Sequence, residues 1–98
     1  MTNYSRGAIF ERKVKKAFED EGWVVIRSAG SHGQFDLVCI SAYGSIMLLQ
    51  CKTRKPTRKE ILEFCKATNF FIRTEFKALS TLIVYPKCDF FKAMGWTL

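Results

Sequence analysis

The sequence predicts an α/β domain in which a central mixed β-sheet is flanked by helices. Three observations predict it: a helical repeat of apolar residues near the N-terminus, two strand-like apolar runs joined by a short turn, and a second helical repeat followed by another strand-like run. A chain of 98 residues has room for one hydrophobic core, so we expect a single domain over residues 1–98. Because 48% of the residues are hydrophobic, intrinsic disorder is excluded.

The first predicted element is a helix over residues 7–21. Phe10, Val14 and Phe18 repeat at the four-residue spacing of one helix face. The remaining faces are rich in Lys and Arg, so we expect the helix to bury one side and to present a cationic one. The β-branched and aromatic run at residues 23–26 then predicts a strand.

Residues 35–41 and 45–52 are two apolar runs separated by a short turn that ends in glycine, which predicts a hairpin. If the paired positions have numbers that sum to about 86, Asp36 lies opposite Gln50. Both side chains then share a face with Lys52, because side chains alternate with period two. Three polar groups are thus expected to converge. The other face takes an apolar set: Phe35, Leu37, Cys39, Met47, Leu49 and Cys51.

The second half begins with a helix start signal. Thr57 with Glu60 three residues later is the pattern of a capping box, and the helix is expected to run from there towards residue 76. An irregular apolar connection over its last part is the alternative, and its aromatic residues are expected in the core and in a dimer interface. Residues 79–85 predict a strand, and residues 90–97 predict a final strand at the sheet edge.

The four cysteines have wide, irregular spacing without a CxxC pair, which argues against a zinc site. Each has apolar neighbours in the sequence, where a free cysteine behaves as a small hydrophobic residue. We therefore expect reduced thiols in the core at Cys39, Cys51, Cys65 and Cys88.

Sixteen Lys and Arg against nine Asp and Glu leave a formal net charge of +7, which indicates a polyanionic partner, with nucleic acid first. A membrane surface also attracts such charge, but no apolar run approaches the ~18 residues of a spanning helix. The N-terminal residues show neither a secretory signal nor a transit pattern. We therefore expect a cytoplasmic, DNA-associated protein without a membrane partner.

Hydrolysis of a phosphodiester needs oxygen ligands for a hard cation, a source of hydroxide and positive charge near the phosphate. The side chains of Asp36 and Gln50 and the backbone carbonyl of Cys51 offer such oxygens for Mg²⁺ or Mn²⁺. Glu11, next to the apolar stripe of the first helix, is expected to complete the metal shell. Lys52 is expected to position or deprotonate the attacking water.

These residues lie in segments that resemble a known family. The runs at residues 6–12, 25–31, 35–38 and 50–52 are similar in order and spacing to the archaeal Holliday junction resolvases, which belong to the PD-(D/E)XK nuclease superfamily. The resemblance covers residues 6–55 well and the rest loosely. It implies a restriction-endonuclease-like core and a homodimer with two active sites. Each site would cut one strand of a four-way DNA junction with Mg²⁺ or Mn²⁺.

By this resemblance, Glu11 and Asp36 are metal ligands, Lys52 is the catalytic lysine, and Ser31 is a serine of the catalytic loop. One position departs from the family. The family usually has Glu where this chain has Gln50, so the site loses a negative charge, although an amide carbonyl still coordinates a hard cation. The resemblance also implies phosphate contacts for Arg6, Arg12 and Arg27.

The charge pattern adds other basic residues to the expected DNA surface, because phosphate contacts dominate the binding of DNA-processing proteins. Solubility is the alternative role for these charges. His32, in the same loop as Ser31, either touches DNA or remains solvated. The additional DNA-binding candidates are Lys15, His32, Arg54, Lys55 and Arg58.

The sequence leaves two other functions open. One is a nuclease of the same superfamily that cuts single-stranded, flap or nicked DNA. The other is a catalytically inactive DNA-binding module in which Gln50 marks a lost active site.

Overall fold

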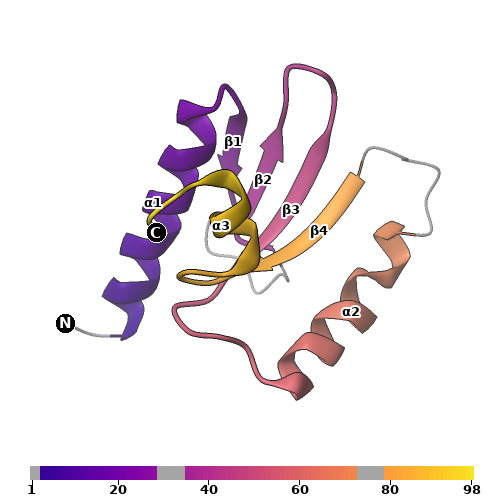
Figure 1. The fold of residues 1–98 in the computed structure, drawn as a ribbon. Coiled ribbons are helices and arrows are strands. Elements are labelled where there is room, and N and C mark those ends of the chain that lie inside the picture. Colours follow the sequence, from indigo (N-terminus) through magenta and orange to yellow (C-terminus); the bar gives the residue numbers. More distant parts are fainter. Residues whose placement is uncertain (1–2, 29–34, 73–78) are drawn as a thin grey trace.

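The computed structural model describes residues 3–28, 35–72 and 79–98. Within them the chain forms a four-stranded mixed sheet flanked by helices, which confirms the predicted fold class (Figure 1). The elements in chain order are α1 (Asn3–Asp20), β1 (Val24–Arg27), β2 (Leu37–Ile40), β3 (Ile46–Cys51), α2 (Arg58–Ile72), β4 (Leu79–Val84) and α3 (Asp89–Met94).

The strands lie in the order β1-β2-β3-β4. The first three are antiparallel neighbours, and β4 runs parallel to β3 after the chain crosses over through α2 (Figure 1). In the hairpin of β2 and β3, Leu37 pairs with Leu49 and Ile40 pairs with Ile46. This is the register predicted from the sequence, so the alternation of side chains correctly assigned most positions to their face.

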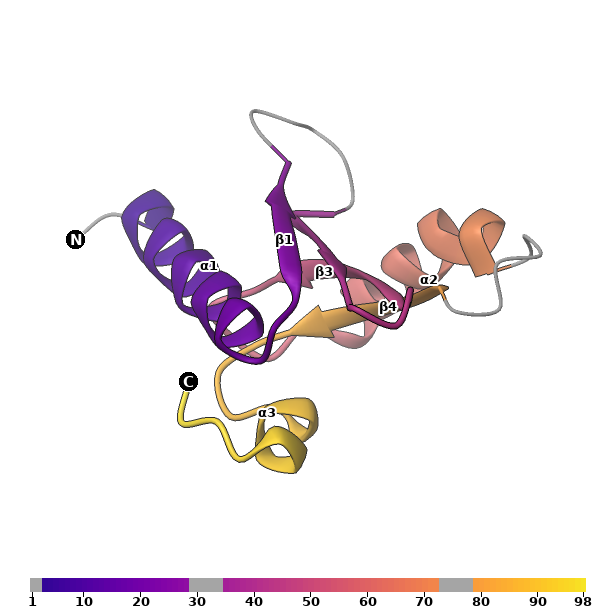
Figure 2. The same ribbon diagram turned by 90° about the horizontal axis from the view of Figure 1, so that it is seen from above.

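Helices lie on both faces of the sheet, with α1 and α3 on one side and α2 on the other (Figure 2). The main hydrophobic core lies between the sheet and the helices α1 and α3. Helix α1 contributes the predicted apolar stripe, since Phe10, Val14 and Phe18 are all buried. They pack with Leu37 and Leu49 of the hairpin, both fully buried. Burial of this stripe is what fixes α1 across the sheet.

The other face of the sheet is only partly covered. Helix α2 lies against β4 and buries Phe64 and Thr68. The alternate side chains of β1 remain open, since Val24 is 62% exposed and Ile26 is 53% exposed. These two residues pair with Ile40 and Val38 of β2, so the open strip continues onto the neighbouring strand.

The predicted final strand at residues 90–97 is wrong, because residues 90–94 lie in helix α3 and the rest of the segment follows the helix without forming a strand. Its rings surround Phe18 of α1: Phe90 stacks on Phe18 at 5.8 Å between ring centroids, and Trp96 meets it edge-on at 5.1 Å. A strand would place Phe90 and Phe91 on opposite faces, whereas one helical turn lets both rings join this cluster. Gly95, with φ 74°, ends the helix in the left-handed conformation.

Phe35 was predicted on the face of Leu37, and this is also wrong. Its ring meets Phe64 of α2 at 6.1 Å between centroids, on the opposite side of the sheet. The chain bends at Asp36, before β2 begins, so the strict alternation of the strand does not extend back to residue 35.

All four cysteines are free, as predicted, but one is not in the core. Cys39 and Cys88 are buried, and burial raises the pKa of Cys39 to about 12. Cys65 is exposed, because the buried side of α2 is formed by its neighbours Phe64 and Thr68.

Among the described residues, none of the helices has the length and apolar character needed to cross a membrane.

Candidate active site

Asp36 directly precedes β2 and lies beside the end of β3. Its backbone N–H donates to the carbonyl of Leu49 at 2.8 Å, and its carboxylate Oδ2 accepts the backbone N–H of Cys51 at 2.7 Å. The backbone N–H of Ser28 donates to the carbonyl of Asp36 at 2.9 Å. The carboxylate thus takes the place of the next backbone acceptor in the ladder, and three neighbouring bonds fix its position.

A second carboxylate, from Glu11 of α1, is directed to the same region. Burial raises the pKa of the Cys51 thiol, and the negative charges of Asp36 and then Glu11 raise it further. Both carboxylates therefore act on one half-buried residue at the end of β3, although they come from different elements. That these two acids share a metal ion stays a prediction.

Glu11 is held by an arginine of the neighbouring strand. The Nε of Arg27, at the end of β1, donates to its Oε1 at 2.7 Å, and the Glu11 side chain is only 16% exposed. A carboxylate beside the buried stripe of α1 needs such a partner because an unpaired charge is costly to desolvate. Arg27, expected at DNA phosphate, thus also balances the charge of a proposed metal ligand.

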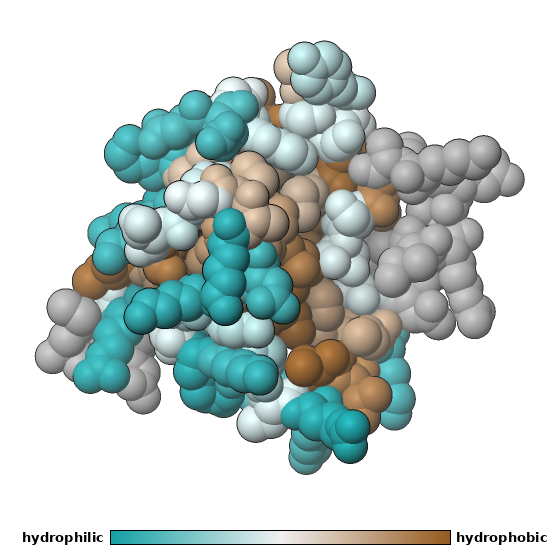
Figure 3. Space-filling view, in the orientation of Figure 1, coloured by the Kyte–Doolittle hydropathy of each residue, from teal (hydrophilic) through white to brown (hydrophobic). Residues whose placement is uncertain are grey.

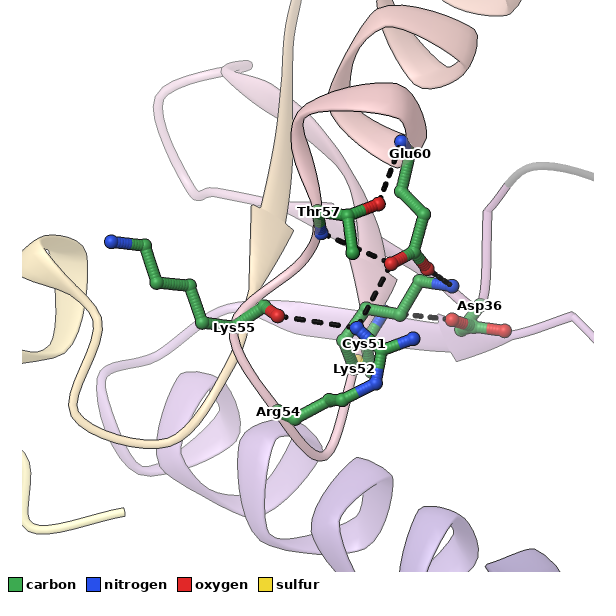
Figure 4. Close-up of polar contacts among 7 residues, drawn as sticks. All are labelled: Asp36, Cys51, Lys52, Arg54, Lys55, Thr57 and Glu60. Atoms are coloured by element: carbon green, nitrogen blue, oxygen red, sulfur yellow. Dashed lines mark hydrogen bonds and ion pairs between the residues drawn. The ribbon is translucent and has the colours of Figure 1, made fainter.

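Lys52 follows β3 directly and is fixed at both ends. Its backbone N–H donates to the carbonyl of Val84 at 2.8 Å, and its Nζ lies 2.9 Å from Oε2 of Glu60 (Figure 4). Figure 4 shows the Lys52 amine in the region between Glu60 of α2 and Asp36 of the hairpin. The proposed catalytic lysine is therefore bound to an acid that sequence reasoning treated only as a helix cap.

Glu60 performs the predicted capping as well. Its backbone N–H donates to Oγ1 of Thr57 at 3.2 Å, and its Oε1 accepts the backbone N–H of Thr57 at 3.0 Å. The same Oε1 accepts Nη1 of Arg54 at 2.9 Å. Together, the hydrogen bonds from Arg54, from the Thr57 backbone and from Lys52 lower the pKa of Glu60 from its ordinary value of 4.5. Its carboxylate is thus charged throughout the neutral range.

Gln50 is half-buried in β3, where its neighbour in β4 is Ile83. The two hydrogen bonds that Asp36 makes to β3 go to Leu49 and Cys51, on either side of it. This places the backbone of Gln50 beside Asp36, as the predicted register requires.

Among the described residues, no group of three or more His, Cys, Asp and Glu side chains lies close enough to hold a metal ion. The oxygens that the sequence assigns to a metal are the carboxylates of Asp36 and Glu11, the amide carbonyl of Gln50 and the backbone carbonyl of Cys51. Such a set suits a hard cation such as Mg²⁺ or Mn²⁺, which prefers oxygen ligands and retains several waters. It does not suit zinc, which favours thiolate and imidazole.

Apart from Arg27 of β1, the predicted DNA-binding residues that the structure describes fall into two groups (Figure 1). One lies on α1, and there Lys15 is engaged with Glu19 at 3.2 Å. The other lies on the connection from β3 to α2 and the first turn of α2. Hydrophilic side chains gather along α1 and along this lower edge (Figure 3). The exposed members are Arg6, Arg12, Arg54, Lys55 and Arg58, whereas Ser31 and His32 lie outside the described residues.

The fold is shared with a solved nuclease. The crystal structure of a repair endonuclease from Pyrococcus abyssi superposes with a TM-score of 0.60 at 15% sequence identity, over 91% of this chain and 44% of that one. Identity this low shows the common fold alone, a mixed sheet flanked by helices.

The sequence then identifies the family. Residues 2–76 match the family described as archaeal Holliday junction resolvase (Hjc), and the chain belongs to this family. A relative from Methanocaldococcus jannaschii, named crossover junction endodeoxyribonuclease Hjc, is 44% identical over 55 residues. That match covers 56% of this chain and 40% of the relative, so the chain spans well under half of the relative's length. The family match includes Glu11, Asp36, Gln50 and Lys52.

Proposed function

We propose that this protein is a metal-dependent, structure-selective DNA endonuclease that hydrolyses phosphodiester bonds in four-way junctions. The observation that carries the proposal is the carboxylate of Asp36, which is fixed at the end of the hairpin beside Lys52 in the segment that matches the resolvase family. A carboxylate bound to a backbone N–H at 2.7 Å is held in place before any ligand arrives.

In the proposed reaction, Asp36, Glu11, Gln50 and the carbonyl of Cys51 hold Mg²⁺ or Mn²⁺. When bound, the cation polarises the scissile phosphate and makes a coordinated water more acidic. Lys52 orients the attacking water and offers positive charge to the phosphate as negative charge develops on it. Ser31, which follows β1 in the sequence and lies outside the described residues, is proposed to assist at the same site.

Binding to DNA is proposed to rest on backbone phosphates rather than base edges. Two exposed cationic groups, on α1 and on the β3–α2 connection, lie at the end of the sheet that holds the site. Such binding weakens steeply with salt and carries little sequence information. His32, which lies outside the described residues, is proposed as a further DNA contact. The corresponding localisation is the cytoplasm, where the protein would be bound to DNA.

A homodimer is proposed because the β1 side of one sheet face is left exposed. Val24 and Ile26 are more than half exposed, and they pair with the apolar Ile40 and Val38. Apolar strips of this kind mark surfaces that associate, and a domain of this size gains stability when a second copy buries them. An unfolding midpoint that rises with protein concentration is the expected result, and a concentration-independent midpoint argues for a monomer.

One observation favours a second candidate, a DNA-binding module without catalysis. Gln50 supplies no negative charge where the family usually has Glu, and the described residues contain no cluster of three acidic or other metal-binding side chains. A site with only two carboxylates binds a divalent cation more weakly. Another possible substrate for the same active site is single-stranded, flap or nicked DNA.

The test is cleavage of an end-labelled four-way junction in Mg²⁺ or Mn²⁺ by the wild type, Asp36→Asn and Lys52→Ala. Matched controls carry the same changes at exposed residues of α3, namely Asp89→Asn and Lys92→Ala. We expect paired cuts with the wild type and both controls, and a loss of cutting with both site variants. Junction binding without cutting by the wild type supports the second candidate and contradicts the first.

A further inference from the structure

We propose that Glu60 is a positioning residue for Lys52, so that the first turn of α2 sets the place of the catalytic amine. This inference rests on the proposed function, because it assigns a role to a residue that acts through Lys52. It concerns a contact between two consecutive elements, the end of β3 and the start of α2 (Figure 4).

The two carboxylate oxygens of Glu60 have separate partners. Oε1 accepts the backbone N–H of Thr57 at 3.0 Å and Nη1 of Arg54 at 2.9 Å. Oε2 lies 2.9 Å from Nζ of Lys52. The capping bonds fix the carboxylate against the helix start, and the remaining oxygen is left to hold the amine. Lys52 and Glu60 are 30% and 21% exposed at their side chains, so the pair keeps some contact with water.

This arrangement matters for the lysine because of its length. A lysine side chain has four rotatable bonds and loses much conformational freedom when it is held in one place. An amine that is already tethered reaches the reacting phosphate without that ordering at each turnover. The backbone of Lys52 is anchored by its bond to Val84, so the only remaining freedom is in the side chain that Glu60 holds.

Helix capping alone is the rival explanation for Glu60, and two substitutions separate it from positioning. In Glu60→Gln, the amide oxygen still accepts the N–H of Thr57, but the charged contact with Lys52 is lost. In Thr57→Ala, the bond from the Glu60 N–H to Oγ1 is lost, but the contact with Lys52 remains. The first change affects positioning, and the second affects the cap.

The experiment measures single-turnover junction cleavage, junction affinity and the unfolding midpoint for the wild type, Glu60→Gln, Glu60→Asp and Thr57→Ala. We expect Glu60→Gln to slow cleavage about tenfold at unchanged affinity, as loss of a supporting contact at a catalytic site typically does. Glu60→Asp keeps the charge on a shorter side chain and should recover part of the rate. Thr57→Ala should lower the midpoint and cut at the wild-type rate. Wild-type cutting by Glu60→Gln, or an equal loss in Thr57→Ala, overturns the inference.

A second readout does not depend on activity. The reactivity of Lys52 towards an amine-acylating reagent is measured by peptide mass spectrometry, with the exposed Lys55 in the same chain as internal reference. We expect the labelling of Lys52 relative to Lys55 to rise several-fold in Glu60→Gln and to stay at the wild-type level in Thr57→Ala. Unchanged labelling in Glu60→Gln overturns the inference even if the wild type cuts no DNA, in which case the proposed function fails separately.

Discussion

Asp36 has two roles that can be separated by substitution. Its carboxylate accepts the Cys51 N–H at 2.7 Å and is also a proposed metal ligand. A hydrogen bond to a charged group contributes about 1.5–3 kcal/mol to the free energy of unfolding. Asp36→Ala leaves the N–H of Cys51 without this acceptor, so we expect a loss in that range. For a domain of this size, each 1 kcal/mol corresponds to roughly 4–8 °C in Tm.

Asp36→Asn keeps a carbonyl oxygen at the same place, and we expect it to lose less than about 1 kcal/mol because the backbone bond is retained in neutral form. Both substitutions remove the negative charge and should abolish stabilisation by metal. In the wild type, Mg²⁺ at ten times its Kd adds about 1.4 kcal/mol by mass action.

The assay is urea unfolding of the wild type and both variants, in EDTA and in increasing Mg²⁺. The expected order of stability in EDTA is wild type, Asp36→Asn, Asp36→Ala, and only the wild type should gain stability with Mg²⁺. If Asp36→Asn and Asp36→Ala are equally stable in EDTA, the hydrogen bond from the Cys51 N–H to Asp36 contributes nothing to the free energy of unfolding. If both variants gain as much from Mg²⁺ as the wild type, Asp36 is not a metal ligand.

Four further predictions follow from the same structure. Gln50→Glu restores a carboxylate at the site and should lower the Mg²⁺ concentration for half-maximal cleavage by about tenfold; an unchanged or higher requirement contradicts a ligand role at this position. Phe91→Ala empties a fully buried position between α3 and α1, and urea unfolding should show a loss of about 3–5 kcal/mol, whereas less than 1 kcal/mol would mean that α3 is not part of the core. The folded-state pKa of Glu60 lies below 4.5, so its contribution to stability is present above pH 4.5 and is lost as the pH falls from there through the folded-state pKa; the stability difference between wild type and Glu60→Gln should therefore be constant near neutral pH and shrink in acid. Junction affinity should fall linearly on a log–log plot against salt, and Arg12→Gln should reduce the slope by about one unit, since exposed Arg12 is expected to neutralise one phosphate.

The parts of the fold that the sequence predicted correctly are those set by local periodicity. The register of β2 and β3 follows from alternating side chains and a short turn at Gly44, which has φ 85°. The stripe of α1 follows from helical spacing, and the start of α2 follows from the capping pair Thr57 and Glu60, whose bonds the structure contains. In each case neighbours in sequence determine the structure.

The parts that were wrong depend on tertiary contacts. The aromatic run at residues 90–97 has the composition of a strand, but packing of Phe90 and Trp96 around Phe18 favours a helix. The face of Phe35 was misassigned because the chain bends at Asp36. No local pattern indicates these contacts.

For the candidate site, the sequence predicted roles for two acids and a lysine, which stay predictions, but it did not indicate the ion-pair partners of Glu11 and Lys52. Glu11 binds Arg27 and Lys52 binds Glu60, and both pairs join elements whose relative placement follows from packing. The available signal was a capping glutamate directly after a basic segment, and it does not by itself indicate which cation the glutamate holds.

The most direct test of the central claim compares substrates under one condition. End-labelled four-way junction, flap, single-stranded and duplex DNA are incubated with the wild type in Mg²⁺ or Mn²⁺, and the cut positions are mapped. We predict paired cuts, symmetric about the branch point, in the junction alone. Preferential cutting of flap, single-stranded or duplex DNA would contradict a junction resolvase, and binding of the junction without any cutting would contradict the assignment of this site as catalytic.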